Sequence, residues 1–309
     1  MTDEQLTEIF FPYYNREIER ISKENIKFAY YTDLTTTMSI LKNQELWLRN
    51  VMLMNDYFEV KQGLGLLKYY LIEKNYKDKL IKILTAIGND KSYWENILKE
   101  FLKDNEPAYF LHTYIACFTE HKVCEYDGRL SMFRAYGRGN GSALIFNANS
   151  KLNLQIDISK VLYCNKEDFK AYLDEFIISL GKNVCKLKYE KIEIVEKLLK
   201  QAILFAILSI KHPGFKEEKE WRIIYCDKIM KNPEYNKIYK PALEVINGVP
   251  QKIYKLNLNN IMIANLLDEV IIQGTHDSVA AKLALDYYLR EFRVRNDYIK
   301  ISSIPYRNW

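Results

Sequence analysis

The residues best suited to chemistry stand immediately before an apolar segment in the last third of the chain. Glu217, Glu218 and Glu220 occupy three of four consecutive positions, and Trp221 and Arg222 follow directly. Carboxylates this close repel one another at neutral pH, so a fold that orders them needs a neighbouring cation, a metal ion or a polar ligand. The apolar segment that follows has the composition of a strand. We therefore expect chemistry at the start of this strand.

Strand alternation would sort these side chains onto two faces. Glu218, Glu220 and Arg222 are expected on one face, with Lys219, Trp221 and Ile223 on the other. In a catalytic interpretation, Glu220 acts with Glu218 beside it. In a structural interpretation, Glu220 forms an ion pair with Arg222 and Trp221 faces the core. Charge clusters mark functional sites only on average, so both interpretations stay open.

A metal-dependent nuclease is a rival hypothesis. Glu217, Glu218 and Lys219 would supply the Glu-x-Lys half of the site, with Asp56 or Glu59 as the distant acid. The carboxylates would hold Mg²⁺ and Lys219 would orient the attacking water. This motif is short and arises often by chance. The nuclease therefore ranks below the enzyme hypothesis that follows from a family resemblance, given below. In a third hypothesis, the same cluster recognises a nucleotide or a partner protein without catalysis.

The elements that must position the cluster begin near the N-terminus. Residues 27 to 32 are rich in aromatic side chains and predict a strand, Asp33 is suited to cap a helix, and residues 45 to 50 predict a second strand. Residues 109 to 119 form a continuous apolar run that is typical of a central strand buried on both faces. The opening unit is therefore strand, helix, strand.

Helices and further strands fill the rest of the chain. We expect an N-terminal helix at about 3 to 24 and a helical insertion at about 60 to 107. Further helices are predicted at 166 to 181, 187 to 211 and 277 to 290, and strands at 143 to 147, 159 to 163, 252 to 256, 269 to 273 and 298 to 302. This irregular order favours a single α+β domain over residues 1 to 309, with a mixed or antiparallel central sheet and helical additions.

Three glycines lie between a predicted short helix and a strand. Gly137, Gly139 and Gly141 fit a GxGxG pattern only loosely, and they precede a strand where a dinucleotide-binding or P-loop motif requires a helix. The pattern therefore supports neither phosphate cradle, and it favours a tight hairpin.

Composition excludes several classes of protein. The chain has 309 residues, of which 48% are hydrophobic and 28% charged, as expected of a folded globular protein. The net charge of +5 is spread along the chain, which is weak support for nucleic-acid binding. The longest apolar run, 202 to 210, is too short to cross a bilayer.

Five cysteines without a CxxC pair favour reduced thiols in the cytoplasm. Cys117, His121 and Cys124 lack the second ligand pair of a zinc site, so we expect no metal.

The chain resembles the DUF2971 family of uncharacterised bacterial proteins, and four groups of motifs carry the resemblance. They are YYTDLTTTMSILKNQELWLRN followed by Asn55, Asp56 and Glu59; CFTE with LSMFRAYGRGNGSALIFN; EEKEWRIIY; and EVIIQG with ISSIPYR. Together they span most of the chain.

The DUF2971 family is in turn distantly similar to the ADP-ribosyltransferase superfamily, whose folds often open with a strand bearing His-x-Thr, a helix and a second strand. The resemblance implies an ADP-ribosyltransferase-like sheet and cleavage of the nicotinamide–ribose bond of NAD, with Glu220 and Glu218 as catalytic carboxylates. Tyr30 stands where the family usually has His, and a phenol can still donate a hydrogen bond. The cofactor-binding residues implied are Tyr30, Tyr31, Thr32, Arg134, Tyr136 and Arg222.

The same resemblance implies a biological setting. NAD would be a substrate, and a protein or a nucleic acid would accept the ADP-ribose unless water does. The chain would be a cytoplasmic bacterial protein, an antiphage or toxin-like effector with a partner protein in a defence system and no membrane partner.

Overall fold

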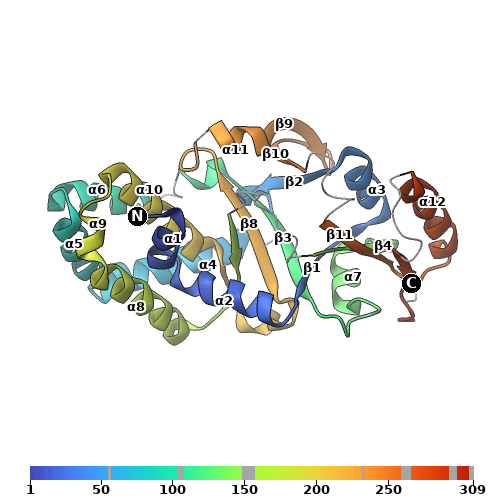
Figure 1. Ribbon diagram of the computed structural model, residues 1–309, viewed down its shortest axis with the longest axis horizontal. Coiled ribbons are helices and arrows are strands. Elements are labelled where there is room, and N and C mark those ends of the chain that lie inside the picture. The colour runs from blue at the N-terminus through green and yellow to red at the C-terminus, as the bar shows by residue number, and fades with distance from the viewer. Residues whose placement is uncertain are drawn as a thin grey trace.

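A mostly antiparallel, open sheet of ten strands runs through the centre of the computed structural model, which describes residues 1–54, 57–103, 108–147, 157–231, 233–258, 266–291 and 298–305. Helices gather at both ends of this sheet (Figure 1). The strands of the sheet are β1 (Lys27–Asp33), β2 (Glu45–Asn50), β3 (Thr113–His121), β4 (Gly141–Phe146), β5 (Ile158–Lys160), β8 (Glu220–Cys226), β9 (Tyr239–Ile246), β10 (Val249–Asn257), β11 (Leu267–Ile272) and β12 (Ile299–Ile301). An α+β fold with a mostly antiparallel sheet and many helices is therefore confirmed.

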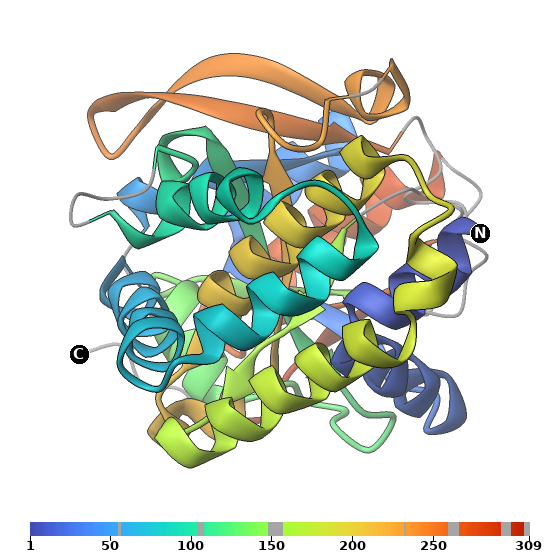
Figure 2. The same ribbon diagram turned by 90° about the vertical axis from the view of Figure 1, so that its left-hand side faces the viewer.

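The helices form a large group at one end of the molecule and a small group at the other (Figure 1). The large group contains α1 (Asp3–Phe10), α2 (Pro12–Lys23), α4 (Tyr57–Lys68), the π-helix η2 (Tyr69–Glu73), α5 (Tyr76–Ile87), α6 (Lys91–Leu102), α8 (Lys166–Lys182), α9 (Val184–Leu187) and α10 (Ile192–Leu208). The remaining helices are α3 (Leu34–Asn43), α7 (Leu130–Tyr136), α11 (Pro233–Ile238), α12 (Ser278–Arg290) and the 3₁₀ turns η1 (Val51–Leu53), η3 (Phe110–His112) and η4 (Pro213–Glu218). Figure 2 looks onto the large group, with the sheet behind it and the β9–β10 hairpin above.

The order of strands explains how the sheet opens in its middle. It runs β12-β11-β4-β1-β3-β2-β10-β9, while β8 pairs with the other edge of β3 and with β5. Within this sheet, as far as the structure describes it, only β11 and β12 are parallel. A separate short pair joins β6 (Leu162–Tyr163) to β7 (Ile210–Lys211) in parallel.

Strand β3 has two different partners along one edge. Residues 119 to 121 pair with β1, and residues 114 and 115 pair with β2. Between them, residues 116 to 118 pair with β8 alone among the described strands. The strands β1 and β2 therefore diverge beside the middle of β3, and a gap in the sheet results.

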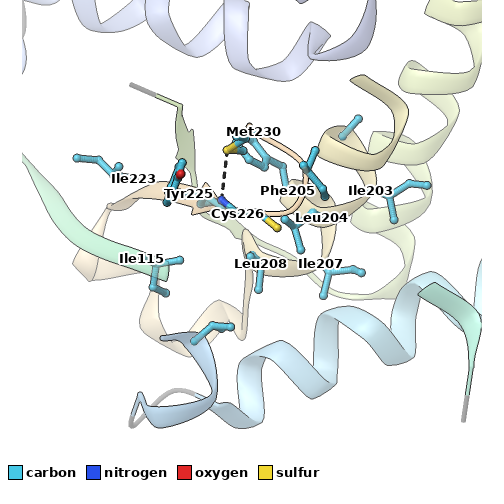
Figure 3. Packing of buried hydrophobic residues seen from close by; sticks show 14 of the residues in the cluster. Ile115, Ile203, Leu204, Phe205, Ile207, Leu208, Ile223, Tyr225, Cys226 and Met230 are labelled. Atoms are coloured by element: carbon cyan, nitrogen blue, oxygen red, sulfur yellow. Dashed lines mark hydrogen bonds between the residues drawn. The ribbon is translucent and has the colours of Figure 1, made fainter. Parts of the chain in front are cut away.

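Helix α10 is the centre of the largest core. Every residue from Gln201 to Leu208 is buried, because this half of the helix lies between other helices and the sheet. Figure 3 shows Leu204, Phe205 and Leu208 beside Cys226 of β8. Each such side chain contributes roughly 1.5–3 kcal/mol when it is fully buried. This packing fixes the position of the residues that follow α10.

Several predicted elements have different bounds in the structure. The N-terminal helix is two helices, because Pro12 lacks an N–H and begins α2. The expected insertion comprises α4, η2, α5 and α6, with residues 104–107 outside the described residues. Helix α10 ends at Leu208, and the next two strand residues are β7.

Two predictions about loops and strands need correction. The glycine-rich turn is not a hairpin, since it joins α7 to β4, whose partners are β1 and β11. Strand β9 was missed, although Asn247 and Gly248 between β9 and β10 both have positive φ, as a two-residue hairpin turn requires.

The structure also bears on the cysteines and on membrane-spanning helices. No disulfide joins the five cysteines, all of which lie in the described part of the chain. Within the same residues, the helices are too short or too polar to cross a membrane.

Helix α4 offers a test of how closely it packs on α10. A Cβ at Gly63 would lie 2.1 Å from the backbone oxygen of Ile207, whereas a Cβ at Gly65 would meet nothing within 4 Å. We expect Gly63→Ala to destabilise the fold by about 1–3 kcal/mol through overpacking. Gly65→Ala should stabilise it by about 0.5–1 kcal/mol, because alanine is the better helix former. Urea denaturation of both variants measures the two changes, and equal signs would contradict this packing.

Candidate functional site

A pocket of about 160 Å³ occupies the gap between β1 and β2. Its floor is the middle of β3, and its walls come from β1, β2, α7 and the residues that lead into β8. Tyr30, Tyr31 and Tyr136 line it, and so do Glu218 and Glu220. The structure thus brings five of the eight predicted site residues to one pocket.

Glu220 is part of a buried cluster of charges. Lys211 Nζ lies 2.7 Å from Glu218 Oε2, 3.1 Å from Glu220 Oε2 and 3.1 Å from Glu59 Oε1. Arg222 donates from Nε to Glu220 Oε1 and from Nη2 to Glu59 Oε2, both at 2.7 Å. Lys211 and Arg222 are the neighbouring cations that the carboxylates required. Among these five side chains, carboxylates outnumber cations by one.

The elements around the cluster hold it rigidly. Arg222 lies opposite Cys117 in the β3–β8 ladder, and its Nη1 donates to the Leu208 carbonyl at 2.6 Å. That carbonyl ends α10, and cations are favoured at helix C-termini. The Glu220 N–H donates to the Tyr163 hydroxyl at 2.7 Å. Helix α10, the short β6–β7 pair and β8 therefore fix Glu220 together.

The electrostatics keep Glu220 ionised. Burial opposes its charge, but Arg222 and Lys211 outweigh burial and lower the pKa of Glu220 to about 2. A carboxylate with so low a pKa is a poor general base at neutral pH. It is well suited to stabilise a positive charge, because it stays negative and cannot move away.

The tyrosines form the opposite and upper walls of the pocket. Burial raises the pKa of Tyr30 and of Tyr31 to about 12 each, so both stay neutral. The Tyr31 hydroxyl accepts from the Arg129 N–H at 2.9 Å and is thereby occupied. Burial, Cys117 and the charges of Glu220 and Glu218 raise the pKa of Tyr136, whose hydroxyl therefore stays protonated beside the carboxylates.

Three predicted cofactor-binding residues lie outside the pocket lining. Thr32 is half-buried further along β1, where its register partner is Ser142. Arg134 is exposed on α7. Arg222 is fully buried behind Glu220, where its guanidinium is engaged by carboxylates and a carbonyl. In this arrangement it holds Glu220, and its predicted contact with a ligand stays a prediction.

The predicted strand alternation holds from Glu220 onward only. Glu218 ends the 3₁₀ turn η4 and Lys219 has φ 46°, so β8 starts at Glu220. Glu218 and Glu220 still meet because both contact Lys211. Trp221 is fully buried on the other face, and its Nε1 donates to Glu120 Oε1 at 3.0 Å. For Trp221, the structure therefore agrees with the structural interpretation, in which this side chain faces the core.

The geometry disfavours the Glu-x-Lys nuclease. The Lys211 ammonium occupies the space between Glu59, Glu218 and Glu220 that a divalent cation would need. Glu217 is exposed, and Asp56 lies outside the described residues. Within those residues, no group of three His, Cys, Asp or Glu side chains is placed to hold a metal ion.

Sequence analysis missed four residues of the site. Lys211 holds the carboxylates, and Trp47, Arg49 and Cys117 line the pocket. Lys211 had a signal, because a lysine at the end of the apolar run 202 to 210 must find buried acids. The strand 45 to 50 alternates so that Trp47 and Arg49 share a face, but the sequence does not tell which face meets a pocket.

The buried ion pairs predict an acid-dependent loss of stability. The pKa of Glu220 is about 2 in the folded chain against 4.5 ordinarily, so its ionisation stabilises the fold above pH 4.5 and this contribution fades as the pH falls toward 2. We expect Glu220→Gln to lower the free energy of unfolding at pH 7 by about 3 kcal/mol, since it leaves buried cations undercompensated. The deficit relative to the wild type should shrink below pH 4.

The exposed neighbour Glu217 supplies the control. Glu217→Gln should change the free energy of unfolding by less than about 0.5 kcal/mol at either pH. Urea denaturation at pH 7 and pH 3.5 measures both variants. A Glu220→Gln deficit that is small at pH 7, or the same at both pH values, would contradict the ionised, paired state of Glu220.

A family model matches part of the chain that includes several residues of this site. Residues 132–223 match the model of a family described as "Protein of unknown function (DUF2971)". None of the curated proteins or solved structures in the comparison matches the chain. The matched segment includes Lys211, Glu218, Glu220 and Arg222, and so contains most of the charge cluster. Over this segment the match bears out the resemblance to the DUF2971 family that the motifs predicted.

Proposed function

We propose that the pocket binds NAD and that the protein cleaves its nicotinamide–ribose bond. One observation carries the proposal: three tyrosines and two carboxylates, expected from distant parts of the sequence, line a single pocket. Tyr30 and Tyr31 come from β1, Tyr136 from the end of α7, and Glu218 and Glu220 from the entry to β8. Aromatic faces and an excess of negative charge suit a pyridinium ring.

The size of the pocket supports a ring-sized guest. A cavity of about 150 Å³ is large enough to hold benzene, and this pocket measures about 160 Å³. It is therefore large enough for nicotinamide but not for a whole dinucleotide. The ribose would lie at the opening near Glu218, and the phosphates would extend outside.

The proposed chemistry uses the carboxylates as fixed charges. When the C–N bond breaks, both electrons go to the nicotinamide nitrogen, which becomes neutral, and the ribose gains oxocarbenium character. Negative charge beside the ribose stabilises this transition state more than the ground state. Both oxygens of Glu220 already accept from Arg222 or Lys211, so Glu220 acts through its field. Glu218 is the more accessible carboxylate, and we assign the contact with the ribose to it.

The ribose cation must then be captured by a nucleophile that loses one proton. Water would give ADP-ribose, and a protein or nucleic-acid acceptor would give a covalent adduct. Consumption of NAD suits a toxin-like or antiphage effector in a bacterial cytoplasm, with a partner protein controlling access to the pocket.

A nucleotide-binding module without catalysis is the second candidate. The observation that favours it is that Glu220 is held by buried cations on both oxygens, as a purely structural carboxylate would be. Turnover separates it from the enzyme hypothesis, because ligand would then bind without release of nicotinamide.

Replacement of Glu218 tests the enzyme hypothesis with little disturbance of the core. We expect the wild type to release nicotinamide from NAD and Glu218→Gln to lower kcat by about 10²–10³-fold, as expected when a group that stabilises transition-state charge is removed. Glu217→Gln, which changes an exposed neighbour in the same way, should keep kcat within about twofold. Chromatography of released nicotinamide measures both rates.

The melting temperature of each variant controls for folding. Unchanged kcat in a folded Glu218→Gln protein would remove Glu218 from the chemistry. If the wild type binds NAD but releases no nicotinamide, with protein and nucleic-acid acceptors also present, the binding module replaces the enzyme.

A further inference from the structure

Arg49 is an arginine of the pocket wall with few partners. It stands on β2 between the pocket and the β10 strand, and it is half-buried. Its Nη2 donates to the Leu53 carbonyl at 3.1 Å and to Gln251 Oε1 at 3.4 Å. Its Nε is buried and has no hydrogen-bond partner, and no carboxylate pairs with Arg49 in the described part of the chain. A buried guanidinium donor without an acceptor is costly and calls for a ligand.

A second arginine reaches the same β9–β10 hairpin as the first, since Arg49 contacts Gln251 and Arg138 contacts Asn247. Burial lowers the pKa of Arg49, and the positive charge of Arg138 adds to this effect. Arg138 is exposed, and among the described residues it contacts Asn247 Oδ1 at 3.5 Å but no carboxylate. Two guanidinium groups that repel each other without an acid between them form a local excess of positive charge.

The backbone at Arg138 adds an independent observation. Its φ is 47°, in the left-handed region that side chains other than glycine and asparagine seldom adopt. Gly137 and Gly139 flank it, yet the strained position itself is an arginine. Such strain clusters at active sites and other functional segments.

Tyr30 and Arg49 both line the pocket. Burial raises the pKa of Tyr30, and the positive charge of Arg49 opposes this effect. The hydroxyl makes no hydrogen bond to any residue in the described ranges. It remains able to donate to an anion beside Arg49.

We propose that Arg49 and Arg138, with the Tyr30 hydroxyl, form an anion subsite that binds the pyrophosphate group of a nucleotide substrate. Guanidinium groups bind phosphate through paired, charge-assisted hydrogen bonds. The subsite deepens the proposed function and rests on it for the identity of the nucleotide, while its binding of phosphate stands on the arginines alone. The carboxylates then serve the cationic ring inside the pocket, and the arginines serve the anionic chain that leaves it.

This assignment replaces Arg134 as the pyrophosphate contact. Arg134, like Arg138, is exposed and does not line the pocket, but Arg138 reaches the β9–β10 hairpin that Arg49 also contacts. Arg49 lines it and was not expected from the motifs. Arg134 is therefore a matched control for the loss of one positive charge.

The binding of inorganic pyrophosphate, measured by isothermal titration calorimetry, tests the subsite without turnover. We expect Arg49→Gln and Arg138→Asn each to weaken binding by about tenfold or more, as the loss of a charge-assisted hydrogen bond predicts. Asparagine tolerates the left-handed backbone at 138, so this variant should keep its fold. Arg134→Gln should bind within about twofold of the wild type.

The outcomes separate the subsite from the enzyme hypothesis. Wild-type protein that does not bind pyrophosphate, or folded Arg49→Gln protein that binds it as the wild type does, would overturn the subsite. Equal weakening by Arg134→Gln would also overturn it, since bulk charge would then explain the effect. Arginine-dependent binding without release of nicotinamide would keep the subsite and sink the enzyme. If Arg49→Gln protein releases nicotinamide with an unchanged KM for NAD, the enzyme hypothesis stands and the subsite is overturned.

Discussion

The buried charges of Lys211 and Arg222 constrain the rest of the structure. Each is at most 2% exposed, and a cation removed from water must be met by carboxylates and hydrogen bonds. Glu59 comes from α4, Glu218 from η4 and Glu220 from β8, so the cluster joins the helical end of the molecule to the sheet. The close packing of α4 on α10 at Gly63 brings Glu59 within reach. Moving any of these elements would leave a charge undercompensated.

The divergence of β1 and β2 determines from which side a ligand can reach the cluster. The middle of β3 carries Ala116 and Cys117, whose small side chains do not fill the gap. Cys117 lies opposite Arg222 in the ladder, and Glu220 lies opposite Thr119. The gap therefore opens onto the carboxylate side of the cluster and leaves the buried guanidinium behind it. Residues 116 to 118 of β3 pair with β8 on one edge, whereas neither β1 nor β2 pairs with them on the other edge.

The sequence predicted elements better than it predicted partners. Strands β1 and β2 and the Asp33 cap follow local rules, and the structure has them within about one residue of the expected bounds. The need for a cation at Glu220 was also predictable, but Lys211 was not assigned, because its contacts depend on how α10 packs. Strand β9 had a usable signal in Asn247 and Gly248 that was overlooked. Arg134 and Arg49 could not be distinguished, since both are arginines near predicted strands and only the sheet order decides which lines the gap.

The double role of the cluster limits what its presence can mean. Glu220 serves the fold through Arg222 and Lys211, so the fold would need it even if the protein catalysed nothing. Glu218 and Arg49 are different, because both are only half-buried and both line the pocket. A buried donor of Arg49 without an acceptor costs stability unless something outside the described residues accepts from it. The strongest ion pairs of the cluster therefore say less about the function of this pocket than the half-buried polar groups that line it.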